Sequence, residues 1–272
     1  MEKLDLSKYC MPLGQPFDPV AFDKMRVDSF NREPGNLTGM DCEKCMNKGR
    51  IAHQKEGGGI WFSECDCMRS RRSIWKMEKS GLKNVIKEMT FDKFQATEAW
   101  QENIKARAMA YADSLDGWLL FCGQVGSGKT HLCTAVCRHR LLKGDDVRYM
   151  PWRDDIAKLK ALALDNDERS KYISDLKTAQ ILYIDDLFKT GKAADGTDNP
   201  TGADVNIAFE IINYRYNNNL PTIVSTEKTT DELIAIDEAT ATRITEKAKK
   251  AYTLSINRDI RRNYRLRDAL EV

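Results

Sequence analysis

The chain has 272 residues, of which 42% are hydrophobic and 31% charged, and its formal net charge is +2. This length allows one large domain or two modest ones, each with a real core. The net charge says little about partners, because the local distribution of charge matters more than the sum. No apolar run approaches the roughly 20 residues of a membrane span, and residues 1–6 lack the apolar stretch of a signal peptide. We therefore expect a cytoplasmic protein with no membrane partner.

Four of the eight cysteines form two close pairs in the first third of the chain. Cys42 and Cys45 are separated by two residues, and Cys65 and Cys67 by one. Two thiolate pairs on either side of a loop are a donor set that a structural, tetrahedral Zn²⁺ prefers. Residues 57–62 between the pairs predict a tight hairpin that brings one pair to the other. Four reduced cysteines without metal, or two disulfides, are the alternatives; disulfides are rare in the cytoplasm.

The cysteine segment is too small to fold without help. Zinc binding contributes on the order of 10 kcal/mol, which couples the metal to folding. His53 is a substitute ligand that four thiols make unnecessary, so we expect it in a solvent-facing loop. Residues 69–79 are basic with interleaved apolar residues, a pattern typical of a docking helix or, more commonly, of a solvated linker helix. We expect residues 1–85 to form this module and its linker helix, and residues 86–272 to form a second domain.

From about residue 90 onward, apolar strands alternate with amphipathic helices, which is typical of a parallel α/β sheet. The predicted strands cover residues 118–122, 146–150, 181–186, 222–225 and 252–256. The predicted helices cover residues 131–142, 153–164, 167–176 and 205–217. Residues 188–204 are rich in Gly and Asp and predict a loop, and Thr229 with Glu232 has the spacing of a capping box that starts another helix.

The segment between the first of these strands and the first helix spells the P-loop pattern G-x-x-x-x-G-K-[ST]. It consists of Gly123, Gln124, Val125, Gly126, Ser127, Gly128, Lys129 and Thr130, followed by His131. Glycines let backbone N–H groups point at phosphate oxygens, and the helix start adds the positive end of its dipole. Lys129 would reach the β- and γ-phosphates of ATP, and the Thr130 hydroxyl would hold Mg²⁺. The strand–loop–helix order disfavours a glycine-rich turn that binds nothing.

Two carboxylates end the apolar strand at residues 181–186, about fifty residues after the P-loop. This is the Walker B pattern, in which Asp185 would hold the Mg²⁺ shell through water and Asp186 would orient or deprotonate the attacking water. Many such ATPases carry Glu at the second position. Because Asp reaches less far, we expect slow hydrolysis that depends on assembly.

Several of these segments together resemble the bacterial and phage replicative-helicase loaders of the DnaC/DnaI type, which are AAA+ ATPases. The likeness rests on the cysteine module ahead of residues 91–94, on the P-loop with residues 131–132, and on residues 213–216 leading to residues 221–223. It covers nearly the whole chain, and the cysteine-rich front resembles the DnaI branch. It implies an AAA+ P-loop fold that binds ATP and self-associates. Its implied partners are the hexameric replicative helicase and single-stranded DNA.

The resemblance also implies roles for residues near the carboxyl end. Glu227 occupies the position of the polar sensor, where Asn is usual, and this departure puts normal γ-phosphate sensing in doubt. Arg243 occupies the place of the arginine finger, which reaches into a neighbour's ATP; a surface arginine in a basic helix has the same appearance in sequence. The sensor 2 arginine lies among residues 261–265, with Arg265 the first choice and Arg262 the second, and Arg261 also present.

Basic residues gather in two further places. Residues 242–268 are basic with Tyr252 and Tyr264 interleaved, a pattern that suits a single nucleic-acid strand, although several of these arginines can instead face ATP or a neighbouring subunit. Lys158 and Lys160 match the helical insert that loaders use on DNA, and solvated helix lysines explain them equally well. The leading hypothesis is an ATP-dependent helicase loader. The alternatives are an IstB-like transposition helper ATPase acting on double-stranded DNA and a nucleotide-gated adaptor with little hydrolysis.

Overall fold

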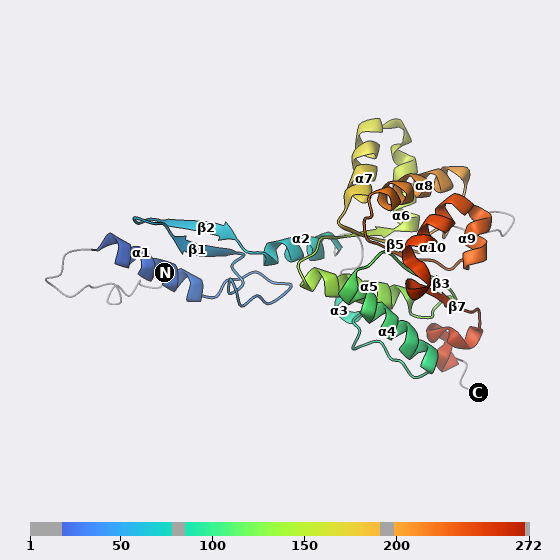
Figure 1. Ribbon diagram of the computed structural model, residues 1–272, viewed down its shortest axis with the longest axis horizontal. Helices are drawn as coiled ribbons and strands as arrows, with labels where there is room; N and C mark the ends of the chain where they lie inside the picture. The colour runs from blue at the N-terminus through green and yellow to red at the C-terminus, as the bar shows by residue number, and fades with distance from the viewer. Residues whose placement is uncertain (1–17, 78–84, 191–198, 270–272) are drawn as a thin grey trace. The chain divides into compact units, whose positions relative to one another are not determined.

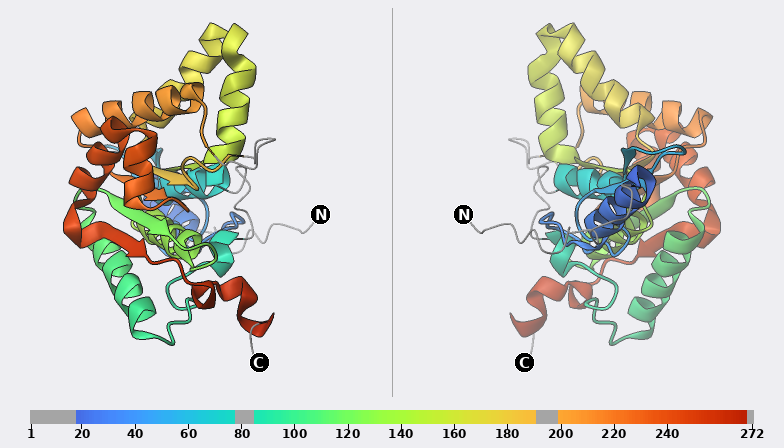
Figure 2. Two further views of the ribbon diagram at one scale, coloured as in Figure 1. Left: turned by 90° about the vertical axis from the view of Figure 1, so that its right-hand side faces the viewer. Right: turned by 90° about the vertical axis from the view of Figure 1, so that its left-hand side faces the viewer.

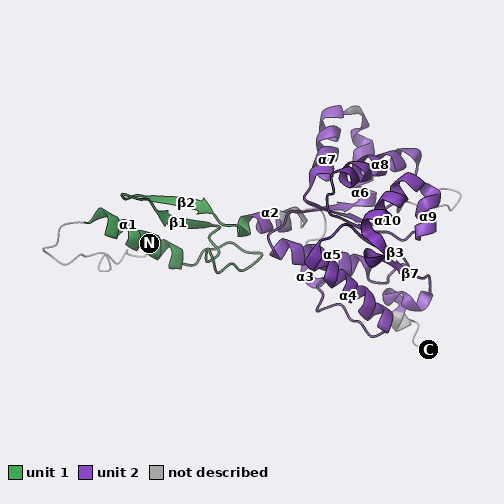
Figure 3. Cartoon of the chain, viewed as in Figure 1, with its two compact units in different colours: residues 1–68 green, residues 69–272 purple. Residues whose placement is uncertain are grey.

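The computed structural model describes residues 18–77, 85–190 and 199–269, and its contacts divide the chain into two compact units, Met1–Met68 and Arg69–Val272 (Figures 1 and 3). The division falls inside helix α2 (Cys67–Met77), ahead of the boundary near residue 85 that we expected, which stays a prediction. Residues 1–6, on which the expectation about a signal peptide rests, lie outside the described residues. No helix of the described ranges is both long and apolar enough to cross a bilayer.

Unit 1 consists of one helix and one hairpin. Helix α1 (Pro19–Arg32) starts where the Asp18 carboxylate accepts the N–H groups of the next turn. Strands β1 (Arg50–Gln54) and β2 (Ile60–Glu64) pair antiparallel, which confirms the predicted hairpin. The Asn31 amide joins helix to hairpin, because it donates to the Ala52 carbonyl and accepts from the Ala52 N–H.

Unit 2 alternates strands and helices along the chain. Its helices are α3 (Val85–Glu88), α4 (Ala99–Ser114), α5 (Lys129–Leu142), α6 (Trp152–Ala161), α7 (Asn166–Thr178), α8 (Gly202–Asn217), α9 (Thr230–Ile236) and α10 (Glu238–Tyr252). Its strands are β3 (Leu119–Gly123), β4 (Val147–Pro151), β5 (Ile181–Asp185), β6 (Thr222–Ser225) and β7 (Thr253–Ile256). Short 3₁₀ turns cover Leu162–Leu164, Ile260–Arg262 and Tyr264–Ala269.

The five strands form one parallel sheet in the order β4-β5-β6-β3-β7. Helices α4 and α5 pack their buried residues on one face, and α6 to α10 pack on the other. Helices α6 and α7 form a pair that projects from the rest of the unit (Figures 1 and 2). Because β6 lies between β5 and β3, the ends of these three strands meet at the carboxyl edge of the sheet, where the P-loop begins.

The five predicted strands are all present, each within a residue of its predicted bounds. Thr229 and Glu232 form the predicted capping box of α9. The predicted loop at residues 188–204 was wrong at its carboxyl end, whereas residues 188–190 lie in no helix or strand. Helix α8 starts at Gly202 because Thr201 and Asp204 form a second capping box, and Phe188 is buried. Residues 191–198 of that loop lie outside the described residues.

Candidate functional site

The P-loop follows β3 and leads into α5. Gly128 is the N-cap of α5 with φ 92°, and Gly123 has φ 98°, a left-handed conformation that glycine adopts without strain. A Cβ at Gly123 would lie 2.1 Å from the Ile256 carbonyl oxygen, and one at Gly128 would lie 2.6 Å from the Phe94 ring. Only glycine fits at these two positions, and the first N–H groups of α5 are thereby presented as an anion site.

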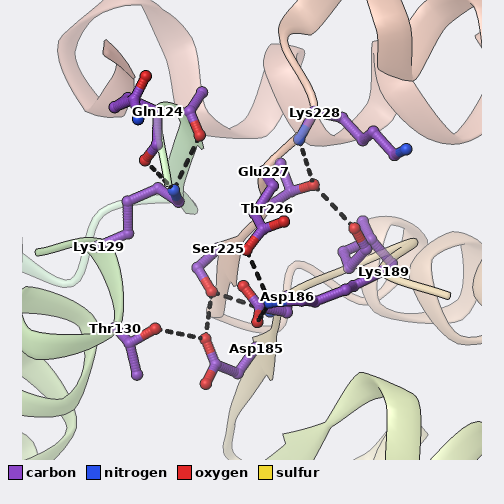
Figure 4. A network of polar contacts seen from close by, with 12 residues as sticks. Gln124, Lys129, Thr130, Asp185, Asp186, Lys189, Ser225, Thr226, Glu227 and Lys228 are labelled. Atoms are coloured by element: carbon purple, nitrogen blue, oxygen red, sulfur yellow. Dashed lines mark hydrogen bonds and ion pairs between the residues drawn. The ribbon is translucent and has the colours of Figure 1, made fainter. Parts of the chain in front are cut away.

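Lys129 is buried at the start of α5, with 5% of its surface exposed. Its Nζ donates to the carbonyl oxygens of Gly123 at 2.9 Å and Gln124 at 2.6 Å (Figure 4). Burial lowers the pKa of Lys129, and the charges of Asp186 and Glu227 partly oppose this shift. The ammonium group of Lys129 carries a positive charge and three N–H donors, so it is suited to bind an anionic ligand.

Asp185 ends β5 and accepts hydrogen bonds from four hydroxyl groups. Thr130 Oγ1 donates to Oδ1 at 3.1 Å, Tyr149 OH to Oδ2 at 3.0 Å and Tyr183 OH to Oδ1 at 2.6 Å, and Ser225 Oγ is the fourth donor. The donors come from α5 and from three adjacent strands. Burial, together with the Asp185 charge, raises the pKa of both tyrosines, so they remain protonated donors. Thr130 and Asp185 thus bring together two oxygen donors of the kind that hold Mg²⁺ in P-loop enzymes.

Asp186 follows in a left-handed conformation, with φ 57°. Its N–H donates to Ser225 Oγ at 3.0 Å, and its carboxylate pairs with Lys189 Nζ at 2.9 Å. The same Nζ lies 2.7 Å from Glu227 Oε1. Burial lowers the pKa of Lys189, but the bonds to Glu227 and Asp186 outweigh it and raise that pKa above its usual value. Both carboxylates predicted to face the γ-phosphate therefore share one ammonium group (Figure 4).

A cavity of about 300 Å³ opens over the P-loop. Its lining includes Gly126, Ser127, Gly128, Lys129, Thr130, His131, Asp186, Glu227, Tyr264 and Arg265, together with Met89, Lys93, Phe94, Gln95 and Gln101. Of the three sensor 2 candidates, Arg265 lines this cavity. Arg262 lies over the Trp100 ring at 5.4 Å, and Arg261 pairs with Asp259 at 2.8 Å. The first three P-loop residues, Gly123, Gln124 and Val125, precede the lining residues in the chain and do not themselves line the cavity.

Arg243 lies on α10 and does not line the cavity. Its Nε donates to Asn213 Oδ1 at 3.0 Å and its Nη1 to the Ala239 carbonyl at 2.7 Å, and the guanidinium lies 5.1 Å from the centre of the Phe209 ring. A half-buried guanidinium held in this way against α8 does not act on the nucleotide of its own chain.

The two lysines of the α6–α7 pair have partners inside the protein. Lys160 Nζ pairs with the buried Asp204 at 2.7 Å, and Lys158 Nζ lies 4.4 Å from the centre of the Tyr172 ring. Tyr252, in the basic tail, bonds through its hydroxyl to Ser114 at 3.1 Å. These contacts favour structural roles for the two lysines over a free DNA-binding surface.

The four paired cysteines meet in unit 1, with every Sγ within 4.8 Å of the others. The distance from Cys42 Sγ to Cys65 Sγ is 3.8 Å, and that from Cys45 Sγ to Cys67 Sγ is 3.6 Å. Tetrahedral Zn²⁺ with Zn–S bonds of about 2.3 Å places sulfur atoms about 3.8 Å apart. The donor set therefore fits zinc.

The neighbours of the cluster also suit a metal. The Gly49 N–H donates to Cys45 Sγ at 3.3 Å. Burial raises the pKa of Cys45, but this N–H and the adjacent thiols outweigh burial and lower the pKa to about 7, so a thiolate ligand is accessible at neutral pH. His53 lies outside the cluster: its ring stacks on Trp61, and its Nε2 lies 2.7 Å from Ser63 Oγ.

Four residues of the site region were not identified from sequence. Tyr149, Tyr183 and Ser225 surround Asp185, and Lys189 bridges two carboxylates. The position of Lys189 three residues after Asp186 was the one local signal, because such a spacing often brings opposite charges together in a turn or helix. The tyrosines had no local signal, since strand alternation alone does not say which polar group a buried side chain meets.

Comparisons with known proteins agree with this geometry. Residues 62–269 match the family described as IstB-like ATP binding protein. The chain is 30% identical over 219 residues to the phage-like element PBSX protein XkdC of Bacillus subtilis (strain 168), covering 76% of this chain and 79% of that protein. It is 25% identical over 191 residues to the replicative helicase loader DnaC of Escherichia coli (strain K12), covering 67% and 74%.

A solved structure supports the fold. The crystal structure of the DnaC helicase loader superimposes with a TM-score of 0.52 at 23% identity, over 61% of this chain and 96% of that chain. This likeness, with the five-stranded parallel sheet, confirms the predicted AAA+ P-loop fold. The sequence matches confirm the family resemblance. The chain belongs to the family of IstB-like ATP-binding proteins, and its relatives include DnaC helicase loaders.

Proposed function

We propose that this protein is an ATP-dependent loader that binds the hexameric replicative helicase and assists its placement on single-stranded DNA. One observation carries the proposal: Thr130 of the P-loop bonds to Asp185, and Lys129 lines the cavity together with Asp186, in a chain similar to a replicative helicase loader. The DNA partner rests on the likeness to the loaders and on the basic tail at residues 242–268.

The roles in ATP binding follow from the positions of the side chains. Lys129 would contact the β- and γ-phosphates, while Thr130 and Asp185 would hold Mg²⁺, which shields phosphate charge. Asp186 would orient the attacking water, and Arg265, which lines the same cavity, would act as sensor 2. Arg243 would serve the ATP of an adjacent copy, so hydrolysis is slow until copies assemble.

The zinc module has a separate role in this proposal. One structural Zn²⁺ would be held by the four cysteines Cys42, Cys45, Cys65 and Cys67. It would cross-link the fold and would take no part in catalysis. Residues 1–85 would recognise the helicase. In this proposal the module recognises the helicase, and the AAA+ unit responds to the bound nucleotide.

A retention assay with the immobilised replicative helicase tests the proposal. Wild-type protein with ATP and Mg²⁺ should be retained and should increase the helicase bound to circular single-stranded DNA. Lys129→Ala should fold normally, lose ATP binding and lose the ATP-dependent part of this gain. The loader function is contradicted if the helicase does not retain the wild-type protein and if that protein does not increase the amount of helicase bound to the DNA. Unchanged ATP affinity in Lys129→Ala contradicts the site.

The family match over residues 62–269 favours a second candidate, a transposition helper of the IstB kind. Such a protein should retain a transposase on double-stranded DNA and not the replicative helicase, so the same assay with both clients separates the two. The ion pair between Asp186 and Lys189 also supports a nucleotide-gated adaptor with little hydrolysis. Single-turnover hydrolysis with and without helicase and single-stranded DNA distinguishes an adaptor from an ATPase.

A further inference from the structure

One ammonium group, that of Lys189, joins two carboxylates that line the cavity, those of Asp186 and Glu227. Lys189 Nζ is 2.9 Å from Asp186 Oδ2 and 2.7 Å from Glu227 Oε1. Both carboxylates line the cavity with Lys129, and the Lys189 ammonium lies against them without itself being a lining residue. All three side chains of the bridge are partly shielded, with between 24% and 34% of each exposed, so the pairs are stronger than pairs in open water.

The backbone that carries Lys189 is held firmly. The Leu187 N–H donates to the Ser225 carbonyl at 2.8 Å, and Thr226 Oγ1 donates to the Leu187 carbonyl at 2.8 Å. Phe188 is 1% exposed, and its ring meets Trp152 edge-on at 5.4 Å. Because the turn is anchored on β6 and in the core, the side chain of Lys189 leaves it in a defined direction, toward Glu227.

The carboxylate of Glu227 favours a cation at this place. Glu227 stands where the family resemblance expects a neutral amide, and a carboxylate there repels a γ-phosphate unless its charge is neutralised. Lys129 is engaged with the P-loop carbonyls, on the other side of the two acids. Lys189 supplies a positive charge directly beside Glu227 and, having three N–H groups of which two are used, retains one donor.

We propose that Lys189, held in place by its ion pair with Glu227, is the γ-phosphate sensor of this protein. Without a γ-phosphate, Lys189 holds Asp186 in an ion pair. When ATP binds, the γ-phosphate competes for the ammonium, Glu227 keeps its bond to Lys189, and Asp186 is released to orient water. ADP has no group that competes in this way. The proposal rests on ATP binding at the P-loop, as inferred above.

Competition between labelled and unlabelled nucleotides, followed by fluorescence anisotropy, tests this role. Lys189→Met should weaken binding of a non-hydrolysable ATP analogue about 10- to 100-fold, the range of one charge-assisted hydrogen bond, and leave ADP binding nearly unchanged. Lys189→Arg keeps the cation and should retain the preference for ATP. Lys177→Met is the matched control, because Lys177 forms a comparable ion pair with Glu210 at 3.2 Å outside the cavity; both affinities should stay at the wild-type level.

A double variant decides between sensing and simple neutralisation. If Lys189 only neutralises Glu227, then Lys189→Met combined with Glu227→Gln should recover ATP affinity. If Lys189 donates to the γ-phosphate, the double variant should stay as weak as Lys189→Met, and recovery overturns the proposal. Equal losses for ATP and ADP in Lys189→Met also overturn it. If the wild-type protein binds neither nucleotide, ATP binding itself is refuted. This failure is separate from failure of the sensor proposal, because it is seen before any variant is compared.

Discussion

Removal of one zinc ligand should unfold unit 1 and spare unit 2. Cys45 is 2% exposed and is one of the four clustered thiols, so Cys45→Ser removes one of the four sulfur ligands. Among the described residues of unit 1, the buried apolar side chains besides the cysteines are Val27 and Ala52. Complete burial of one valine stabilises by about 1.5–3 kcal/mol, whereas a structural zinc contributes on the order of 10 kcal/mol. A bound zinc would therefore be the largest single contribution to the stability of unit 1.

The measurements are zinc content and limited proteolysis. Wild-type protein should release one zinc per chain when its thiols are modified, and Cys45→Ser should release none. In the variant, and in wild-type protein treated with a chelator, trypsin should cut unit 1 rapidly while unit 2 keeps its thermal transition and its nucleotide affinity. Unit 2 is spared because its P-loop cavity is lined by residues 89–265 alone.

Lys44→Met provides the control. Lys44 belongs to the same cysteine knuckle but pairs with the exposed Asp66 at 2.6 Å, a surface contact of small value. Its zinc content and protease resistance should match the wild type. A zinc-free wild-type preparation whose unit 1 resists trypsin and still binds the helicase would show that the cysteines do not need a metal.

Two further predictions concern arginines. Arg215 is fully buried and donates to five oxygen atoms, among them the carbonyls of Leu176 and Pro221; Arg215→Met should lower the free energy of unfolding by about 3 kcal/mol or more, since each unsatisfied buried acceptor costs about 1–3 kcal/mol. Urea unfolding measures this change, and a loss of under about 1 kcal/mol would contradict the reasoning. Arg243→Ala should bind ATP normally but not hydrolyse it, and mixing it with Lys129→Ala subunits should restore activity at the interfaces that pair an intact P-loop with an intact arginine. No recovery in the mixture would refute a role in trans.

The strands and the P-loop of unit 2 were predictable because their signals are local. Each strand is a short segment of mostly apolar or β-branched residues, and helical segments separate the strands, a pattern typical of a parallel sheet. The capping boxes at Thr201 and Thr229 are equally local, yet the first was overlooked within a Gly- and Asp-rich segment. The boundary of α8 was therefore wrong, although its signal was present.

The contacts of the site were not predictable in the same way. Asp185 and Tyr149 are on different strands, and Lys189 and Glu227 are 38 residues apart. They meet because the sheet order places β6 beside β5, and strand order depends on how helices cover both faces and not on any one segment. The sequence could place Glu227 at the edge of the cavity. It could not identify Lys189 as the cation that neutralises Glu227.

By itself, the amino-acid sequence determined the P-loop, the two acids after β5, the zinc-type cysteine spacing and the α/β pattern, because each depends on residues close together in the chain. Only the tertiary structure decided which groups surround Asp185, that Lys189 joins Asp186 to Glu227, and that Arg265 and not Arg262 lines the cavity. Those pairings depend on distances between segments far apart in sequence, and such distances are set by the packing of the whole sheet and its helices.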